Sequence, residues 1–172
     1  LRLSRGLGDV YKRQHSRFDA IDRTYSYLIF NSPSRNVLLD DFYYWEQAEL
    51  DIKKMNEESK CLIGKHDFTS FRSLSCGSNN PERNIKKIEI NKLGNIVEIK
   101  ITANAFLQNM VRIIVGTLLE IGKYQIKIPL KEILESKDRN KAGITINPKG
   151  LIFLGPSYEN ITKLKPEKSP LI

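Results

Sequence analysis

The sequence is poor in cysteine. It has two cysteines in 172 residues, Cys61 and Cys76. Two thiols make neither a disulfide framework nor a zinc site. We therefore expect reduced thiols, as in cytosolic proteins, and no metal site.

Long apolar runs are also missing. No run approaches the roughly 18 residues that cross a bilayer. The basic N-terminal residues are not followed by the apolar stretch of a signal peptide. Hydrophobic residues still make up 40% of the chain, enough for a packed core. These features predict a protein without membrane spans, and most simply a cytoplasmic one.

Positive charge, in contrast, is in excess. The chain has 28 lysines and arginines against 20 acidic residues, a net charge of +8. A protein this basic is a candidate for an acidic partner, most commonly a nucleic acid. A generally basic proteome would give the same charge, so charge alone does not decide.

The hydrophobic pattern predicts strands and helices in mixed order. Alternation along 85–106, with Gly94-Asn95 between the two runs, predicts an antiparallel hairpin with one buried face. We expect further strands at 23–30, 42–45 and 151–158, and helices at 52–62, 108–121 and 129–136. This order predicts an α+β fold, in which helices pack on one face of a largely antiparallel sheet. The other face would be free to hold a ligand.

Local signals define one of these helices. Asp51 is a suitable N-cap, and Ile52, Met55, Ser59 and Leu62 share one helical face. Gly64 fits just past the helix end. The following residues, 66–71, are too few for more than one turn of helix.

Arg112 does not fit its surroundings. It lies among Met110, Val111, Ile113 and Ile114, in a helix that is apolar on most faces and therefore largely buried. A buried guanidinium without a partner costs several kcal/mol. Arg112 therefore reaches solvent, a carboxylate or a phosphate. A snorkelling side chain or a plain ion pair would explain it, as would an anion-orienting arginine in a cleft.

Five segments in order resemble the A-type tRNA pseudouridine synthases, specifically their C-terminal half. They correspond to the family motifs F-H-A-R-F-x-A, R-x-Y-x-Y, G-x-H-D-F-T-S-F-R, N-A-F-x-x-x-M-V-R and the G-L that opens the last strand. Here they stand at 15–20, 23–27, 64–72, 104–112 and 150–151. The first departs from its pattern, because Gln14 replaces the family phenylalanine.

The resemblance implies a fold and an activity. Family members have two similar α+β lobes joined through one extended sheet, with a basic cleft between them, and they work as homodimers. They isomerise uridine to pseudouridine on the 3′ side of the anticodon arm of tRNA. An essential aspartate takes part, and neither a cofactor nor a metal is needed.

The resemblance also assigns site residues. Tyr25 matches the active-site tyrosine that stacks on the uracil, and Leu151 matches the apolar residue on the other face of the base. Arg112 matches the arginine that pairs with the catalytic aspartate. Without the resemblance, Tyr25 and Leu151 would be taken for ordinary residues of a strand core.

Four basic residues are candidates for phosphate contacts: Arg72, Arg83, Lys86 and Lys87. Arg72 belongs to a matched motif. The two lysines fit a solvated strand face equally well. His66 and Asp67 suggest an acid–base pair, but in the family they belong to a turn, so we interpret them as structural or capping residues.

The family motif G-R-T-D-A-G-V-H-A, which carries the catalytic aspartate, does not occur in the sequence. We expect three segments: a leader at 1–14, a C-terminal lobe at 15–158 and a polar tail at 159–172. The leader is either a flexible arm or foreign sequence joined to the natural frame, and we favour the second interpretation. The chain would then be a fragment, inactive alone, with an exposed sheet edge where the lobes join.

Three functions remain in competition. The chain is part of a tRNA pseudouridine synthase, a non-catalytic RNA-binding module, or a ribosomal or structural protein. The third rests on basicity alone, and Arg112 in an apolar helix argues against it.

Overall fold

The computed structural model of the protein describes residues 20–158. The expected leader at 1–14, all but the last residue of the motif at 15–20 and the expected tail at 159–172 lie outside the described residues.

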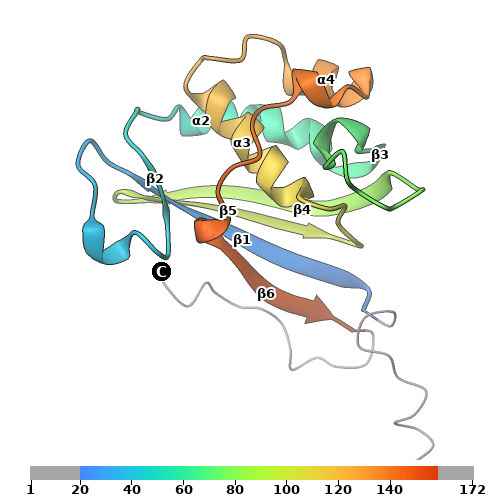
Figure 1. Ribbon diagram of the computed structural model, residues 1–172, viewed down its shortest axis with the longest axis horizontal. Helices are drawn as coiled ribbons and strands as arrows, with labels where there is room; N and C mark the ends of the chain where they lie inside the picture. Colours follow the sequence, from blue (N-terminus) through green and yellow to red (C-terminus); the bar gives the residue numbers. More distant parts are fainter. Residues whose placement is uncertain (1–19, 159–172) are drawn as a thin grey trace, which may run out of the picture.

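The described chain builds one six-stranded sheet under a layer of helices (Figure 1). Its strands run in the order β2-β1-β5-β4-β3, and β6 pairs with β1 beside β2. Only the pairing of β1 with β2 is parallel. The strands are β1 (Asp22–Asn31), β2 (Tyr44–Glu46), β3 (Gly64–Asp67), β4 (Glu82–Leu93), β5 (Ile96–Ala103) and β6 (Leu151–Ser157).

Three α-helices lie on one face of this sheet (Figure 1). They are α2 (Ile52–Ser59), α3 (Met110–Gly122) and α4 (Leu130–Ser136). Short 3-10 helices join the elements: η1 (Val37–Leu39), η2 (Lys60–Leu62), η3 (Thr69–Phe71), η4 (Arg139–Lys141) and η5 (Pro148–Gly150). The predicted α+β fold, with a largely antiparallel sheet, is confirmed. Within the described part of the chain, every helix is too short or too polar to cross a bilayer.

The core forms between α3 and the sheet. Val97, Ile99 and Ile101 on β5 are fully buried beneath the helices, whereas Thr102, in the alternate position, bonds to Thr24 of β1 on the opposite face at 3.0 Å. Period-two alternation places successive side chains on opposite faces. The apolar face of β5 therefore meets α3, which is itself apolar around most of its circumference.

The predicted hairpin is β4 and β5. Gly94 has a φ of 57° in the two-residue turn, a conformation that hairpin turns of this length require and glycine adopts without strain. The structure adds a β-bulge: Ile85 pairs with Ala103 and Lys87 with Thr102, so Lys86 is an extra residue. The bulge leaves both Lys86 and Lys87 exposed.

The region around α2 matches the prediction in part. Oδ1 of Asp51 caps the helix by accepting the N–H of Lys54 at 2.9 Å, and 3-10 helix η2 continues the helical path to Leu62. Gly64, expected just past the helix, has a φ of 109° and begins β3. This strand was not predicted, because four residues are too few to show a period. The single expected turn of helix is η3.

The chain that leads from α4 to β6 passes very close to α3. A Cβ atom built on Gly116 would lie 2.1 Å from the carbonyl oxygen of Ile144. The absence of a side chain at Gly116 lets the backbone of residues 142–146 lie directly on the helix, near Arg112 four residues earlier.

Candidate functional site

Tyr25 lies at the centre of three aromatic rings beside the end of β5. Its ring centroid lies 5.1 Å from that of Phe106, nearly perpendicular, and 4.9 Å from that of Phe153. Phe106 belongs to the loop between β5 and α3, and Phe153 pairs with Tyr25 across β1 and β6. Phe153 is 53% exposed. The cluster therefore offers aromatic surface to a planar ligand.

Leu151 lies on β6 two residues before Phe153 of this cluster. It pairs with Tyr27 and lies on the same sheet face as Phe153, because residues two apart in a strand share a face. Leu151 is half-buried and packs against the core. The structure thus brings Tyr25 and Leu151 together on the sheet face that the helices cover, so the expectation that the opposite face would hold the ligand is wrong for these two residues. Sequence reasoning missed Phe153, whose spacing from Leu151 was the available signal.

Arg112 projects from the first turn of α3 and is half-buried. Its Nε donates to the carbonyl oxygen of Ile146 at 2.7 Å, and its Nη1 donates to Oδ1 of Asn109 at 3.0 Å. No acidic side chain of residues 20–158 forms an ion pair with Arg112. A guanidinium has five N–H groups, so this arginine is oriented by neutral acceptors and keeps donors for an anion.

Tyr27 is a further polar residue next to Arg112, and sequence reasoning did not single it out. Its side chain is fully buried, and its hydroxyl donates to the carbonyl oxygen of Asn147. Burial raises the pKa of Tyr27 far above its ordinary value; Tyr44 adds to this rise, and the positive charge of Arg112 opposes it. The Tyr27 hydroxyl is therefore a neutral donor at physiological pH.

The side chains of Arg72 and Arg83, the second residue of β4, meet at Ser78 in the loop that precedes this strand. Nη1 of Arg72 donates to the carbonyl of Ser78 at 3.2 Å, and Nη2 of Arg83 donates to the hydroxyl of the same residue at 3.1 Å. Arg83 also donates to the carbonyls of Asn80 and Glu82. The N–H of Ser73 bonds to the carbonyl of Gln108 at 3.0 Å, which joins this loop to the one that carries Phe106. Arg72 keeps more of its donors for an outside ligand than Arg83 does.

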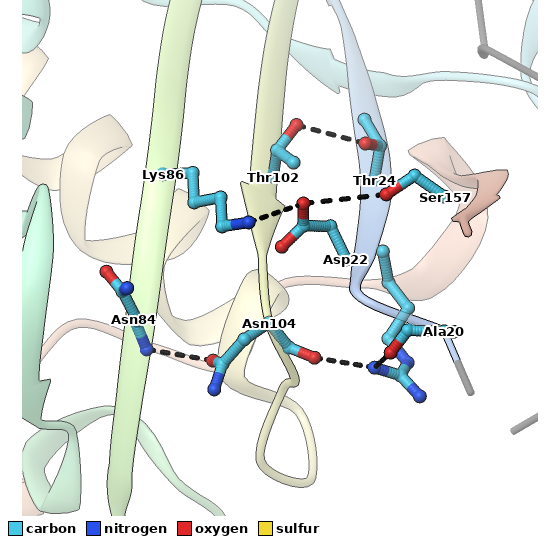
Figure 2. A network of polar contacts seen from close by, with 9 residues as sticks. Ala20, Asp22, Thr24, Asn84, Lys86, Thr102, Asn104 and Ser157 are labelled. Atoms are coloured by element: carbon cyan, nitrogen blue, oxygen red, sulfur yellow. Dashed lines mark hydrogen bonds and ion pairs between the residues drawn. The ribbon is translucent and has the colours of Figure 1, made fainter. Parts of the chain in front are cut away.

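Lys86 and Lys87 lie elsewhere. Figure 2 shows Lys86 reaching across β5 to Asp22 of β1, an ion pair of 2.8 Å. Lys87 pairs with Glu89 at 2.8 Å. In register, Lys87 stands opposite Thr102, on the face away from the helices. The structure therefore separates the two lysines from the two arginines and neutralises both lysine charges locally.

His66 and Asp67 support the structural interpretation. Oδ1 of Asp67 accepts the backbone N–H of Thr69 at 2.9 Å and its hydroxyl at 2.6 Å, and Oδ2 pairs with Lys137 at 3.1 Å. The His66 ring bonds to the carbonyl of Ile63. These contacts fix the turn into η3, and no group of three metal-ligating side chains gathers in the described part of the chain.

Comparison with known proteins identifies the family of the chain. The sequence model of a family described as tRNA pseudouridine synthase matches residues 59–159. The chain is 44% identical over 145 residues to tRNA pseudouridine synthase A of Francisella tularensis subsp. novicida, and 45% identical to that of Francisella philomiragia subsp. philomiragia.

Each of these alignments covers 84% of this chain and 56% of the relative. The chain thus spans about half the length of the curated relatives it matches. Because the family model covers more than half of the residues and the relatives share close to half of the aligned positions, the chain belongs to the tRNA pseudouridine synthase family.

Proposed function

We propose that this chain forms one side of a site that converts uridine to pseudouridine in the anticodon arm of tRNA. The observation that carries the proposal is Arg112. Its guanidinium is held by two neutral oxygens and has no acidic partner among residues 20–158. A guanidinium oriented in this way, close to Tyr27 on the strand that also carries Tyr25, suits a carboxylate that comes from outside the described residues.

Tyr25 and Leu151 bind the reacting base in this proposal. The target uridine leaves the RNA stack, which costs a few kcal/mol, and aromatic or apolar surfaces then hold the exposed base. The ring of Tyr25 stacks on one face of the uracil and Leu151 contacts the other. The Tyr25 hydroxyl assists proton transfer when C5 replaces N1 at the ribose.

The catalytic aspartate belongs to the family motif that is absent from this sequence. In the proposal, its carboxylate pairs with the free N–H groups of Arg112. Without this carboxylate, the 172 residues alone bind RNA but do not react. The complete enzyme in this proposal is a cytoplasmic homodimer. Neither a cofactor nor a metal takes part.

RNA phosphates bind at Arg72 and Arg83, whose side chains meet at the loop before β4. This loop bonds to the one that carries Phe106, next to Tyr25, so bound RNA would pass from the arginines to the aromatic cluster. Lys86 and Lys87 are weaker candidates for phosphate contacts, because Asp22 and Glu89 already pair with them.

The proposal is tested in a chimera. Residues 15–158 replace the matching half of the Francisella tularensis subsp. novicida relative, and pseudouridine in tRNA is measured by mass spectrometry of nuclease digests. We expect an active chimera. Arg112→Ala should lower the rate by at least about a hundredfold, the loss typical when a preorganised charged or polar contact is removed, with tRNA still bound.

Lys92→Ala, at an exposed position near the hairpin turn, is the matched control and should react like the parent. Pseudouridine formed at the parental rate by Arg112→Ala would refute the role of Arg112. A folded chimera that binds tRNA but never reacts would favour the RNA-binding module instead.

A further inference from the structure

Residues 146–150, here called the connector, lie between α4 and β6 and contact three separate parts of the protein. Two successive carbonyls of the connector accept side-chain hydrogen bonds. The Ile146 carbonyl accepts from Nε of Arg112 at 2.7 Å, and the Asn147 carbonyl accepts from the buried hydroxyl of Tyr27. One short stretch of backbone therefore joins the site arginine of α3 to the core of β1.

The Asn147 carbonyl is important because of the residue that follows it. Pro148 has no N–H, so the peptide unit between Asn147 and Pro148 can be anchored only through its carbonyl oxygen. Tyr27 supplies that anchor from a side chain that is 0% exposed. A fully buried donor is held in one orientation by its packing, so it fixes the peptide more firmly than an exposed side chain would.

The other end of the connector is also fixed. Nζ of Lys149 pairs with Asp40 at 2.8 Å and with Asp41 at 3.4 Å, in the loop between β1 and β2. Gly150 lies so close to β1 that a Cβ atom there would be 2.3 Å from the carbonyl oxygen of Leu28. The connector is therefore held at both ends, and the carbonyl for Arg112 has a defined position.

We propose that Tyr27 is a positioning residue for Arg112: its hydroxyl fixes the connector, whose Ile146 carbonyl fixes the guanidinium. This inference rests on the proposed function of Arg112 but does not make Tyr27 a contact of the substrate. The planar guanidinium pairs well with a carboxylate only at the correct angle. Small misplacements of a catalytic group are costly in rate.

The first test needs no activity. In the 172-residue chain, nitrogen-15 NMR follows hydrogen exchange at Nε–H of Arg112. Tyr27→Phe keeps the ring and removes the hydroxyl, and it should speed this exchange about tenfold, in proportion to one lost hydrogen bond. Tyr124→Phe is the matched control: it removes a tyrosine hydroxyl bonded to Asp51 beyond the far end of α3 and should leave exchange unchanged.

The second test uses the chimera. Tyr27→Phe should lower kcat roughly tenfold and leave KM and tRNA affinity unchanged, because positioning is lost while binding is kept. In an Arg112→Lys background the same change should lower kcat no further, because a residue that acts only through Arg112 has nothing left to position. A merely structural role would give equal losses in both backgrounds.

A second variant guards against misfolding of Tyr27→Phe. Lys149→Gln removes exposed ion pairs at the other end of the connector, and it should speed Arg112 exchange by a smaller factor. An unchanged rate of hydrogen exchange at Arg112 in Tyr27→Phe would overturn the inference. If that variant does not fold, an unchanged rate in Lys149→Gln would overturn it. Losses of kcat that are equal in the Arg112 and Arg112→Lys backgrounds would overturn it as well. Faster exchange in a chimera that never reacts would instead refute the proposed function and leave the coupling of Tyr27 to Arg112 intact.

Discussion

At the scale of single residues, the two cysteines occupy different electrostatic environments. Hydrogen bonds from the backbone at Ser78 and Gln108 lower the pKa of Cys76, and the charges of Arg72 and Arg83 contribute less. Burial, and then the charge of Glu58, raises the pKa of Cys61 to about 11. The thiolate is the reactive form, so the two thiols should differ in reactivity although both are half-buried.

Iodoacetamide should therefore alkylate Cys76 at least about ten times faster than Cys61 near neutral pH, because a lower pKa leaves more thiolate. Mass spectrometry of tryptic peptides measures both rates in one sample. An anticodon stem-loop should slow alkylation of Cys76 and not of Cys61, since Cys76 lies in the loop of the proposed phosphate contacts. Equal rates without RNA would contradict the difference in thiol environment, and equal protection of both thiols by the stem-loop would contradict the assignment of that loop.

Arg112 could be recognised from sequence, whereas Tyr27 could not. A guanidinium among apolar neighbours is anomalous by composition alone, so it prompts a search for its partner. A tyrosine in a strand is ordinary, and the carbonyl that it holds is 120 residues away. The same limit applies to Lys86, whose partner Asp22 lies two strands across the sheet.

At the scale of elements, the close passage of residues 142–146 over α3 depends on Gly116. Gly116→Ala gains helix propensity of about 1 kcal/mol, but its Cβ would lie 2.1 Å from a backbone oxygen. Backbone atoms have little freedom to move, so the clash outweighs the gain. We expect a net loss of about 2 kcal/mol in the free energy of unfolding, measured by urea denaturation.

Gly77→Ala is the matched control for that substitution. Gly77 is exposed, and a Cβ there would meet no atom within 4 Å. Its effect should stay within about 0.5 kcal/mol. If both alanines had the same effect, the contact between residues 142–146 and α3 would be looser than the structure shows.

Long elements with a sustained hydrophobic pattern were predictable from the sequence, and short or irregular elements were not. The β4–β5 hairpin follows from an alternation that is interrupted only near Lys86, and α3 follows from a long apolar run. The bulge at Lys86 left a trace in the sequence, because Ile85 and Ile88 are three apart where a regular strand would space them by two. Strand β3 left none, since its formation depends on pairing with β4.

At the scale of the whole molecule, the distribution of charge is more informative than its sum. The net charge of +8 predicted an acidic partner, but lysines such as Lys86 and Lys87 are paired with local carboxylates. Arg72 has no acidic partner in the described part of the chain. RNA affinity should therefore depend on individual positions.

We expect Arg72→Ala to weaken binding of the anticodon stem-loop and to reduce the slope of log affinity against log salt by about one, because one phosphate contact is lost. Lys87→Ala should change neither quantity appreciably. Fluorescence anisotropy titrations over a range of salt concentrations measure both. A larger loss of slope in Lys87→Ala would place the RNA on the sheet face opposite the helices.

Strand β1 has a further consequence, for synthesis on the ribosome. It pairs with β5 along one side and with β6 and β2 along the other, yet it is the first of the described strands to be synthesised, and its bond from Tyr27 spans 120 residues. Contacts this distant in sequence form late and slow folding. The edge of nascent β1 that pairs with β6 must therefore stay unpaired until nearly the whole lobe has been translated, because β6 is its last partner to be made. During that interval it is a natural binding segment for chaperones.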